Sequence, residues 1–356
     1  MLLSLIHISL SGVVAWQGDH WEESGVGLIV ENKGTITEPE ERREVMKNRL
    51  SDFIIIDKNE ISSLFLPFDG KHTVLGFSLI DNSMSNTGYA VTTTSGKYFL
   101  KLYSNATDKV ETAAYSFLKG KINVPELYYF DGSKQQFEYS YAIVEYLDGT
   151  SLKSFIQTKN IYSRNIVYEI GKMCAILHRK KYKHDAWLDQ NLSEESLIPK
   201  TDEHILQLLD DKAGEYLQPE TRKRLSNYVK ANSLLFNRIS SESVLCHGDI
   251  NYMNILIAYD KVWFIDFEFA HAGGIYCDIG KFFRTKGTAI QSLIDYRIYE
   301  AFSDGYNSAA SSRLPSDWLR LAHLCDIDSM LVLINRDNTP KEWVTDVEYD
   351  ILSAIN

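Results

Sequence analysis

Two neighbouring stretches decide the fold: residues 244–257 read VLCHGDINYMNILI, and residues 262–268 read VWFIDFE. The apolar runs 255–257 and 262–265 are separated by four residues, and this arrangement predicts a β-hairpin. Such a hairpin carries the chain from a polar loop that ends at Asn254 back to a second polar position, Asp266. We therefore expect a carboxylate and an amide from separate loops to lie close together.

The pattern His-Gly-Asp-x4-Asn at residues 247–254, with Asp266 after it, resembles the aminoglycoside phosphotransferase and choline kinase superfamily. In that superfamily the loop is the counterpart of the protein-kinase His-Arg-Asp loop. The resemblance extends over residues 75–284 and implies an α+β, protein-kinase-like two-lobed fold with a β-rich N-lobe and a mainly helical C-lobe. It also implies a phosphotransferase that uses ATP and Mg²⁺ to phosphorylate an alcohol group of a small molecule.

Phosphoryl transfer needs a base beside the attacking hydroxyl and a divalent metal beside the phosphate oxygens. The resemblance makes Asp249 the catalytic base, and His247 a second candidate that is expected to brace the loop rather than to react. Magnesium prefers oxygen ligands, so Asn254 and Asp266 are the expected metal ligands. Glu268 either assists the metal or faces the substrate. The competing interpretation is that Asp249 and Asp266 merely cap turns at strand ends.

Residues 81–91, DNSMSNTGYAV, resemble the family's nucleotide loop. The loop has no Gly-x-Gly-x-x-Gly, but small polar side chains with adjacent backbone N–H groups are able to cradle phosphates. The candidates for nucleotide binding here are Ser83, Ser85 and Asn86. An ordinary hairpin turn is the alternative.

Lys101 ends a predicted strand where kinase-like folds place the lysine that contacts the α- and β-phosphates. Glu111 is expected to pair with this lysine, although it would also close a capping box with Asp108. The segment around Glu145 to Leu147 resembles the family's hinge, whose backbone would hydrogen-bond the nucleotide base.

The remaining elements follow from hydrophobic periodicity. Residues 89–94 and 98–102 predict a hairpin, residues 139–145 a further strand, and Ser163 the start of a long helix. The rest of the chain is expected to be mostly helical with one short hairpin. Asp278 is interpreted as the cap of a helix, because a carboxylate at that position satisfies free N–H groups.

Three segments are expected along the chain. Residues 1–45 are an uncertain N-terminal extension or an upstream read-in, since Glu41 to Glu44 back-translate to purine-rich codons placed like a ribosome-binding site before Met46. Residues 46–147 form the N-lobe, which binds the nucleotide. Residues 148–356 form the C-lobe, with the catalytic loop and the helices that bind the acceptor.

Composition limits the partners. A formal net charge of -11 leaves no basic footprint for nucleic acid. The cysteines lie too far apart in sequence for a zinc ribbon or a redox Cys-x-x-Cys pair, and are expected to be reduced and mostly buried; they are Cys174, Cys246, Cys277 and Cys325. No run is long and apolar enough to span a bilayer, so we expect a cytoplasmic protein. The oligomeric state is not predicted.

The C-terminal region combines aromatic and acidic residues that suit an ammonium group through ion pairing and cation–π contact. This predicts a cationic acceptor of the aminoglycoside, choline, ethanolamine or thiamine type. A solvated acidic face with core tryptophans explains the same residues equally well. They are Trp318, Asp326, Asp328, Trp343, Asp346, Glu348 and Asp350.

Two other classes remain open. A nucleotide-binding pseudokinase-like module would normally lack the lysine, the base or a metal position, whereas all have candidates in this chain. A true protein kinase would carry Asp-Phe-Gly, Ala-Pro-Glu and an arginine in the catalytic loop, and this sequence has none of them there. A small-molecule kinase is therefore favoured.

Overall fold

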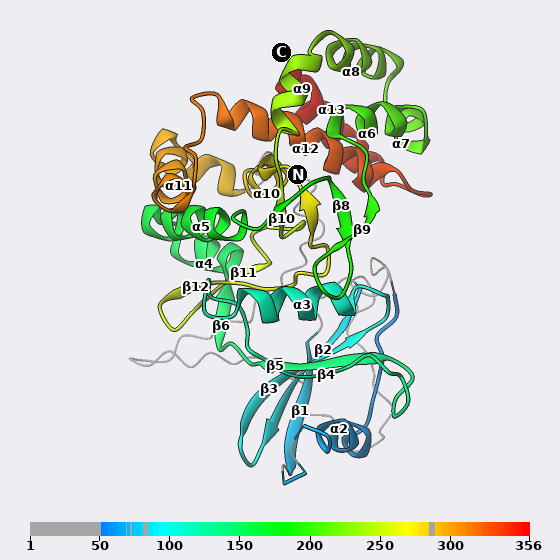
Figure 1. The fold of residues 1–356 in the computed structure, drawn as a ribbon, viewed down its shortest axis with the longest axis vertical. Helices are drawn as coiled ribbons and strands as arrows, with labels where there is room; N and C mark the ends of the chain where they lie inside the picture. Colours follow the sequence, from blue (N-terminus) through cyan, green and yellow to red (C-terminus); the bar gives the residue numbers. More distant parts are fainter. Residues whose placement is uncertain (1–50, 69, 72, 81–84, 285–288) are drawn as a thin grey trace, which may run out of the picture. The chain divides into compact units, whose positions relative to one another are not determined.

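A computed structural model describes residues 51–356, apart from residues 69, 72, 81–84 and 285–288 (Figure 1). The predictions for residues 1–45, for a start at Met46 and for Ser83 lie outside the described residues. Two compact units divide the rest of the chain. The C-terminal unit contains Ala113–Val124 and Asp148–Asn356, and the N-terminal unit contains the described residues before Ala113 together with Pro125–Leu147.

The N-terminal unit is built on an antiparallel five-stranded sheet in the order β1-β2-β3-β5-β4. The predicted hairpin is β2 and β3, in which Tyr89 pairs with Leu100, and the predicted strand after it is β5. Runs of apolar and β-branched residues bounded by turn residues made these strands recognisable. The strands are β1 (Val74–Ile80), β2 (Thr87–Thr93), β3 (Gly96–Tyr103), β4 (Leu127–Asp131) and β5 (Ser140–Glu145).

Helix α2 (Lys58–Phe65) packs against this sheet (Figure 1). It begins with a capping box, in which Asp57 accepts hydrogen bonds from the first turn and Glu60 accepts the N–H of Asp57 at 2.7 Å. Ile61, Leu64 and Phe65 are buried in the core that the sheet shares with the helix. The next helix, α3 (Asp108–Leu118), follows β3.

The C-terminal unit is mainly helical. The long helix predicted from Ser163 onward is α5, in which Val167, Ile170, Cys174 and Leu177 are buried on one helix face. The helices are α4 (Leu152–Lys159), α5 (Arg164–Leu177), α6 (Thr201–Leu209), α7 (Lys212–Tyr216), α8 (Pro219–Ala231), α9 (Ser233–Ile239), α10 (Ile275–Phe282), the 3-10 turn η1 (Ala289–Leu293), α11 (Tyr296–Ala309), α12 (Trp318–Ile334) and α13 (Lys341–Ile355).

The C-terminal unit also has two small sheets, so the prediction of a single hairpin was incomplete. The predicted hairpin is β11 and β12, which β6 extends to three strands. The other sheet has the order β7-β10-β13-β8-β9. Strands this short show no alternation in sequence and form because their neighbours pair with them. They are β6 (Gly149–Ser151), β7 (Lys181–Tyr182), β8 (Ala186–Leu188), β9 (Glu194–Leu197), β10 (Ser243–Cys246), β11 (Ile255–Ala258), β12 (Lys261–Phe264) and β13 (His271–Gly273).

The expected α+β class, with a β-rich N-terminal part and a mainly helical C-terminal part, is confirmed. Within the ranges that the structure describes, no helix has both the length and the apolar character required to cross a bilayer.

Candidate active site

The backbone of the predicted catalytic loop depends on a glycine. Gly248 has φ +83°, and a Cβ at this position would lie 1.9 Å from the carbonyl oxygen of Phe269. An L-residue is strained at this φ and cannot share that space. Glycine in the His-Gly-Asp pattern is therefore a requirement of the loop's shape.

The carboxylate of Asp278 on α10 holds this loop by accepting hydrogen bonds from backbone N–H groups of the loop. Its two carboxylate oxygens accept the N–H groups of His247 at 2.8 Å and of Gly248 at 2.9 Å. Nε2 of His178 lies 3.2 Å from the same carboxylate. Burial alone would raise the pKa of Asp278, but hydrogen bonding and charge interactions with His178 and His247 outweigh burial and lower it.

The prediction that Asp278 caps a helix was wrong. Helix α10 begins at Ile275 after the cap residue Gly274, so Asp278 lies inside its first turn. Its carboxylate binds N–H groups of the catalytic loop instead. The sequence shows an acidic residue near a helix start, but not which N–H groups lie opposite it.

His247 is fully buried and uses both ring nitrogens within the loop region. Nε2 lies 2.9 Å from the carbonyl oxygen of Ile265, which can only accept, so Nε2 carries the proton. Nδ1 then accepts the N–H of Asp249 at 3.3 Å. The ring also stacks on Phe267, with 4.2 Å between centroids. Both ring nitrogens are thus engaged within the protein, and the bracing role of His247 remains a prediction.

The carboxylate of Asp249 is held on one side only. Its Oδ2 accepts from the side-chain amides of Asn254 at 2.8 Å and Asn251 at 3.0 Å. Its Oδ1 accepts no hydrogen bond from the part of the chain that the structure describes. One oxygen is thus fixed, and the other is available to a hydroxyl group.

Asn254 has a side-chain orientation that its contacts determine. Its Nδ2 lies 2.9 Å from the main-chain oxygen of Asp249, an atom that only accepts, so the amide nitrogen must face that oxygen. The amide oxygen of Asn254 therefore points elsewhere, and no donor among the described residues binds it. This leaves an uncharged oxygen ligand beside Asp249.

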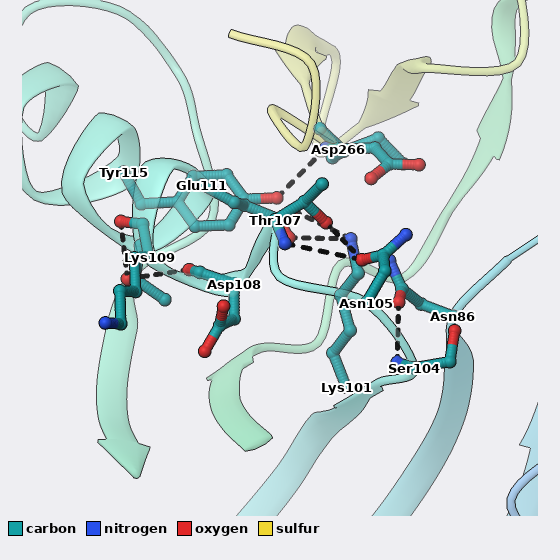
Figure 2. Close-up of polar contacts among 12 residues, drawn as sticks. Asn86, Lys101, Ser104, Asn105, Thr107, Asp108, Lys109, Glu111, Tyr115 and Asp266 are labelled. Atoms are coloured by element: carbon teal, nitrogen blue, oxygen red, sulfur yellow. Dashed lines mark hydrogen bonds and ion pairs between the residues drawn. The ribbon is translucent and has the colours of Figure 1, made fainter. Parts of the chain in front are cut away.

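Asp266 lies next to Asn254, because the N–H of Ile265 donates to the main-chain oxygen of Asn254 at 3.1 Å. Asp266 has φ +66°, in the left-handed region, and its N–H donates to the hydroxyl of Tyr115 at 3.0 Å (Figure 2). Glu268, two residues later, is buried. Amide and carboxylate oxygens are ligand types that Mg²⁺ accepts, so Asn254 and Asp266 remain candidate metal ligands.

In the N-terminal unit, Lys101 and Glu111 form a buried ion pair (Figure 2). Nζ of Lys101 lies 2.9 Å from Oε1 and 2.7 Å from Oε2 of Glu111. The Glu111 side chain is fully buried, and that of Lys101 is 11% exposed. Because Lys101 engages both carboxylate oxygens, the geometry favours the lysine-pairing role of Glu111 over the capping-box role.

The described end of the predicted nucleotide loop is anchored to Ser104. The side-chain oxygen of Asn86 accepts the N–H of Ser104 at 3.1 Å (Figure 2), and the main-chain oxygen of Ser85 accepts its hydroxyl at 2.8 Å. Ser85 and Asn86 are both buried. These contacts fix the loop where it joins β2.

The predicted hinge also has internal partners. Glu145 donates its N–H to the main-chain oxygen of Glu126 at 2.8 Å, and its carboxylate accepts the N–H of Glu126 at 3.2 Å. Leu147 is buried. The side chain of Glu145 is thus committed to the neighbouring segment.

Several carboxylates that suggested a cation site are paired inside the C-terminal unit. Asp326 forms an ion pair with Arg284, with Nε 2.7 Å from Oδ2. Asp328 lies 2.8 Å from Nδ1 of His204, and Glu348 accepts the N–H of Gln218. Asp326 is thus paired with a permanent cation of this chain, and the carboxylates of Asp328 and Glu348 already have neighbours within it.

The two tryptophans of that group have partners too. Trp318 is buried and stacks on Phe302, with 5.6 Å between ring centroids. Arg336 lies over the ring of Trp343 at 4.5 Å. The cationic acceptor remains a prediction, and these residues do not strengthen it.

Some residues of the site were not predicted. Asn251 lies inside the catalytic pattern, and its amide type was the only available signal. Lys281 hydrogen-bonds the main-chain oxygen of Gly248, and its spacing of three from Asp278 places both on one face of α10. The sequence gave no indication of the role of His178, because its partner Asp278 is 100 residues further along the chain.

Comparison with known proteins identifies the family of this chain. The model of a phosphotransferase enzyme family matches residues 76–323, which is more than half of the chain. The chain belongs to this phosphotransferase enzyme family. The expected family resemblance and the expected enzyme class, a small-molecule phosphotransferase with an alcohol acceptor, are confirmed.

Solved structures share the fold. Choline kinase from Cryptosporidium parvum Iowa II has a TM-score of 0.56 and 14% identity over 84% of this chain and 95% of its own. Aminoglycoside phosphotransferase APH(4)-Ia reaches 0.61 with 12% identity, over 84% and 98% of the two chains. Spectinomycin phosphotransferase APH(9)-Ia, solved with ADP and spectinomycin, reaches 0.53 with 15% identity, over 84% and 98%. No curated protein sequence matches this chain.

Proposed function

We propose that the protein transfers the γ-phosphoryl group of ATP, with Mg²⁺, to a hydroxyl group of a small molecule. The observation that carries the proposal is the hydrogen bonding of the Asp249 carboxylate. Two amide groups hold its Oδ2, and its Oδ1 has no donor among the described residues. A carboxylate held in this way is oriented to accept one proton in a defined direction.

In the proposed reaction the acceptor hydroxyl donates its hydrogen bond to Oδ1 of Asp249. The hydroxyl oxygen attacks the γ-phosphorus, and the bond between that phosphorus and the β–γ bridging oxygen breaks. ADP leaves with the bonding electron pair, and the hydroxyl proton passes to Oδ1. Because little covalent chemistry is required of the protein, positioning of the two reactants supplies most of the acceleration.

The proposed metal ligands are the amide oxygen of Asn254 and the carboxylate of Asp266, with Glu268 as a further candidate. When bound, Mg²⁺ would neutralise charge on the phosphate oxygens. The chain's own contribution is the placement of these oxygens. The amide nitrogen of Asn254 donates to Asp249, and the backbone hydrogen bond from Ile265 to Asn254 connects the two loops.

The proposed nucleotide site belongs to residues 46–147, and the catalytic and acceptor sites to residues 148–356. Lys101, oriented by Glu111, would contact the α- and β-phosphates. Ser83, Ser85 and Asn86 would supply the phosphate loop. The backbone from Glu145 to Leu147 would bind the base. The ADP bound to spectinomycin phosphotransferase supports a nucleotide as the second substrate.

For the acceptor we propose a hydroxylated cation of the aminoglycoside, choline, ethanolamine or thiamine type. The support is that similar structures are named as a choline kinase and as aminoglycoside phosphotransferases. The cytoplasmic location and the lack of a nucleic-acid partner remain predictions from the sequence.

The experiment that tests the proposal is Mg²⁺-dependent ATP consumption against a panel of aminoglycosides, choline, ethanolamine and thiamine. We expect one class to stimulate turnover and Asp249→Ala to lower it by about 10²–10⁴-fold, the usual effect of removing a general base. Asp317→Ala, which removes a surface partner of Arg238, is the matched control and should retain activity. Full acceptor-stimulated activity in Asp249→Ala would contradict the assigned base.

A further inference from the structure

Three thiols form a chain in the C-terminal unit. The sulfurs of Cys277 on α10 and Cys325 on α12 are 3.6 Å apart. Cys246, at the end of β10, interacts electrostatically with Cys277, and its thiol donates to the main-chain oxygen of Gly274 at 3.4 Å. All three are in the reduced form. Cys277 therefore has a close neighbour on a separate helix.

The helices that carry Cys277 and Cys325 are in backbone contact. A Cβ at Gly280 would lie 2.4 Å from the main-chain oxygen of Ala322 and 2.9 Å from Cβ of Asp326. Gly280 is one turn after Cys277 on α10, and Asp326 directly follows Cys325 on α12. A disulfide requires Cα atoms about 4.4–6.8 Å apart, and such separations occur only where helices approach this closely.

The two thiols differ in reactivity. Cys277 is partly exposed, whereas Cys325 is 3% exposed. Hydrogen bonding with Cys246 and Cys325, assisted by His271, lowers the pKa of Cys277. Nδ1 of His271 lies 2.9 Å from the carbonyl oxygen of Phe269 and must donate to it. Nε2 of a neutral His271 is then a proton acceptor for the Cys277 thiol.

We propose that Cys277 and Cys325 are a redox modification site, at which hydrogen peroxide forms a reversible disulfide that slows phosphoryl transfer. The thiol proton of Cys277 passes to His271, and the thiolate sulfur attacks one peroxide oxygen. This breaks the O–O bond and gives a sulfenic acid and hydroxide, which takes the proton from His271 and leaves as water. The sulfur of Cys325 then displaces the second oxygen as water, so two thiols and one peroxide yield one disulfide and two waters.

The disulfide would act on the catalytic loop through the next residue in the chain. Asp278 follows Cys277 and holds the N–H groups of His247 and Gly248. The sulfurs must move from 3.6 Å to about 2.05 Å apart. Because α10 and α12 are already in contact at Gly280, the helices have little room to move closer, and we expect the closure to shift α10 locally near Asp278. A displacement of about 1 Å at a catalytic group can lower a rate by about 10²-fold.

The test treats the full chain with hydrogen peroxide, alkylates the remaining thiols and maps the unreduced peptides by mass spectrometry. We expect a peptide pair linked through Cys277 and Cys325 that dithiothreitol separates. Cys325→Ser and Cys325→Ala should not form it, and Cys174→Ser, which changes a fully buried thiol on α5, should behave as the wild type. A link between Cys246 and Cys277, or no link at all, would overturn the proposal.

The second measurement is amide hydrogen exchange of His247 and Gly248, which does not depend on knowing the acceptor. Faster exchange after oxidation, reversed by dithiothreitol, is the expected result. The effect on turnover rests on the proposed function and is measured separately with the acceptor that the panel identifies. Unchanged exchange in the cross-linked protein would refute the link between the disulfide and the catalytic loop, whether or not that panel identifies an acceptor.

Discussion

The substitution Asp278→Asn keeps the shape of the side chain and replaces one of the two oxygens that hold the catalytic loop. In the wild type one oxygen accepts the N–H of His247 at 2.8 Å and the other that of Gly248 at 2.9 Å. An asparagine offers one oxygen and one NH₂ group. Whichever way the amide turns, one backbone N–H faces another donor in a fully buried position.

The expected loss has two parts. A hydrogen bond to a charged acceptor contributes about 1.5–3 kcal/mol, and a buried donor left unsatisfied costs about 1–3 kcal/mol. Together the two parts amount to about 2.5–6 kcal/mol, and the usual cost of breaking a buried charged pair, about 3–5 kcal/mol, lies within that range. We therefore expect Asp278→Asn to lower the free energy of unfolding by about 3–5 kcal/mol. For a domain of about 150–250 residues this corresponds to a fall in Tm of about 6–20 °C.

Urea unfolding followed by tryptophan fluorescence measures this loss, and differential scanning calorimetry checks the shift in Tm. Asp317→Asn is the matched control, because it makes the same chemical change at a surface ion pair with Arg238 and should alter the midpoint little. If Asp278→Asn unfolds at the wild-type midpoint, the loop is not held by Asp278 and the reasoning fails.

The same residue gives a pH dependence. The pKa of Asp278 is lowered in the folded protein, so its contribution to stability is present above the unfolded value of about 3.9. This contribution is lost as the pH falls through the lower folded pKa. In Asp278→Asn the acid limb of a plot of Tm against pH should therefore be shallower than in the wild type. Parallel acid limbs would contradict the assignment.

Three further substitutions test other parts of the structure. Gly248→Ala should lower both Tm and turnover, because a left-handed φ costs an L-residue about 1–2 kcal/mol and the new Cβ would meet the carbonyl oxygen of Phe269. Gly76→Ala is the control in thermal unfolding, because a Cβ at Gly76 would meet no atom within 4 Å. Lys101→Met leaves Glu111 buried without its lysine and should lower the free energy of unfolding in urea by about 3–5 kcal/mol. The double variant Lys101→Met, Glu111→Met should recover most of that loss. An equal loss in the single and the double variant would argue against a buried pair. Burial lowers the pKa of Lys153 to about 8, so between about pH 8 and 10 the folded protein has released a proton that the unfolded chain retains. The free energy of unfolding of the wild type should therefore rise with pH in this range, and that of Lys153→Met should not. Identical slopes of Tm against pH in the two proteins would contradict this assignment.

The parts of the structure that the sequence predicted are those whose signal is local. The hairpins β2–β3 and β11–β12 show apolar runs bounded by turn residues, and α5 shows a helical period. The pattern from His247 to Asn254 was recognisable because its members share one loop. The hydrogen bond from Asn254 to Asp249 within that loop was not predicted.

What the sequence did not predict depends on distant partners. The charges of Asp326 and Asp328 looked available for a cation until Arg284 and His204 were placed beside them. The strands of the sheet that contains β13 are too short to show a period. Cys277 and Cys325 are 48 residues apart, and only the packing of α10 on α12 brings their sulfurs together.

The central claim is that Asp249 serves as the base in transfer of the γ-phosphoryl group to an acceptor hydroxyl. The most direct test is a single-turnover experiment with ATP labelled in its γ-phosphoryl group, comparing the wild type with Asp249→Asn. The asparagine retains an oxygen for the amides of Asn251 and Asn254, so the loop should remain in place. The account predicts labelled acceptor from the wild type, and transfer slower by about 10²–10⁴-fold in the variant with nucleotide still bound. Transfer at the wild-type rate in Asp249→Asn, or release of the label only to water in the wild type, would contradict it.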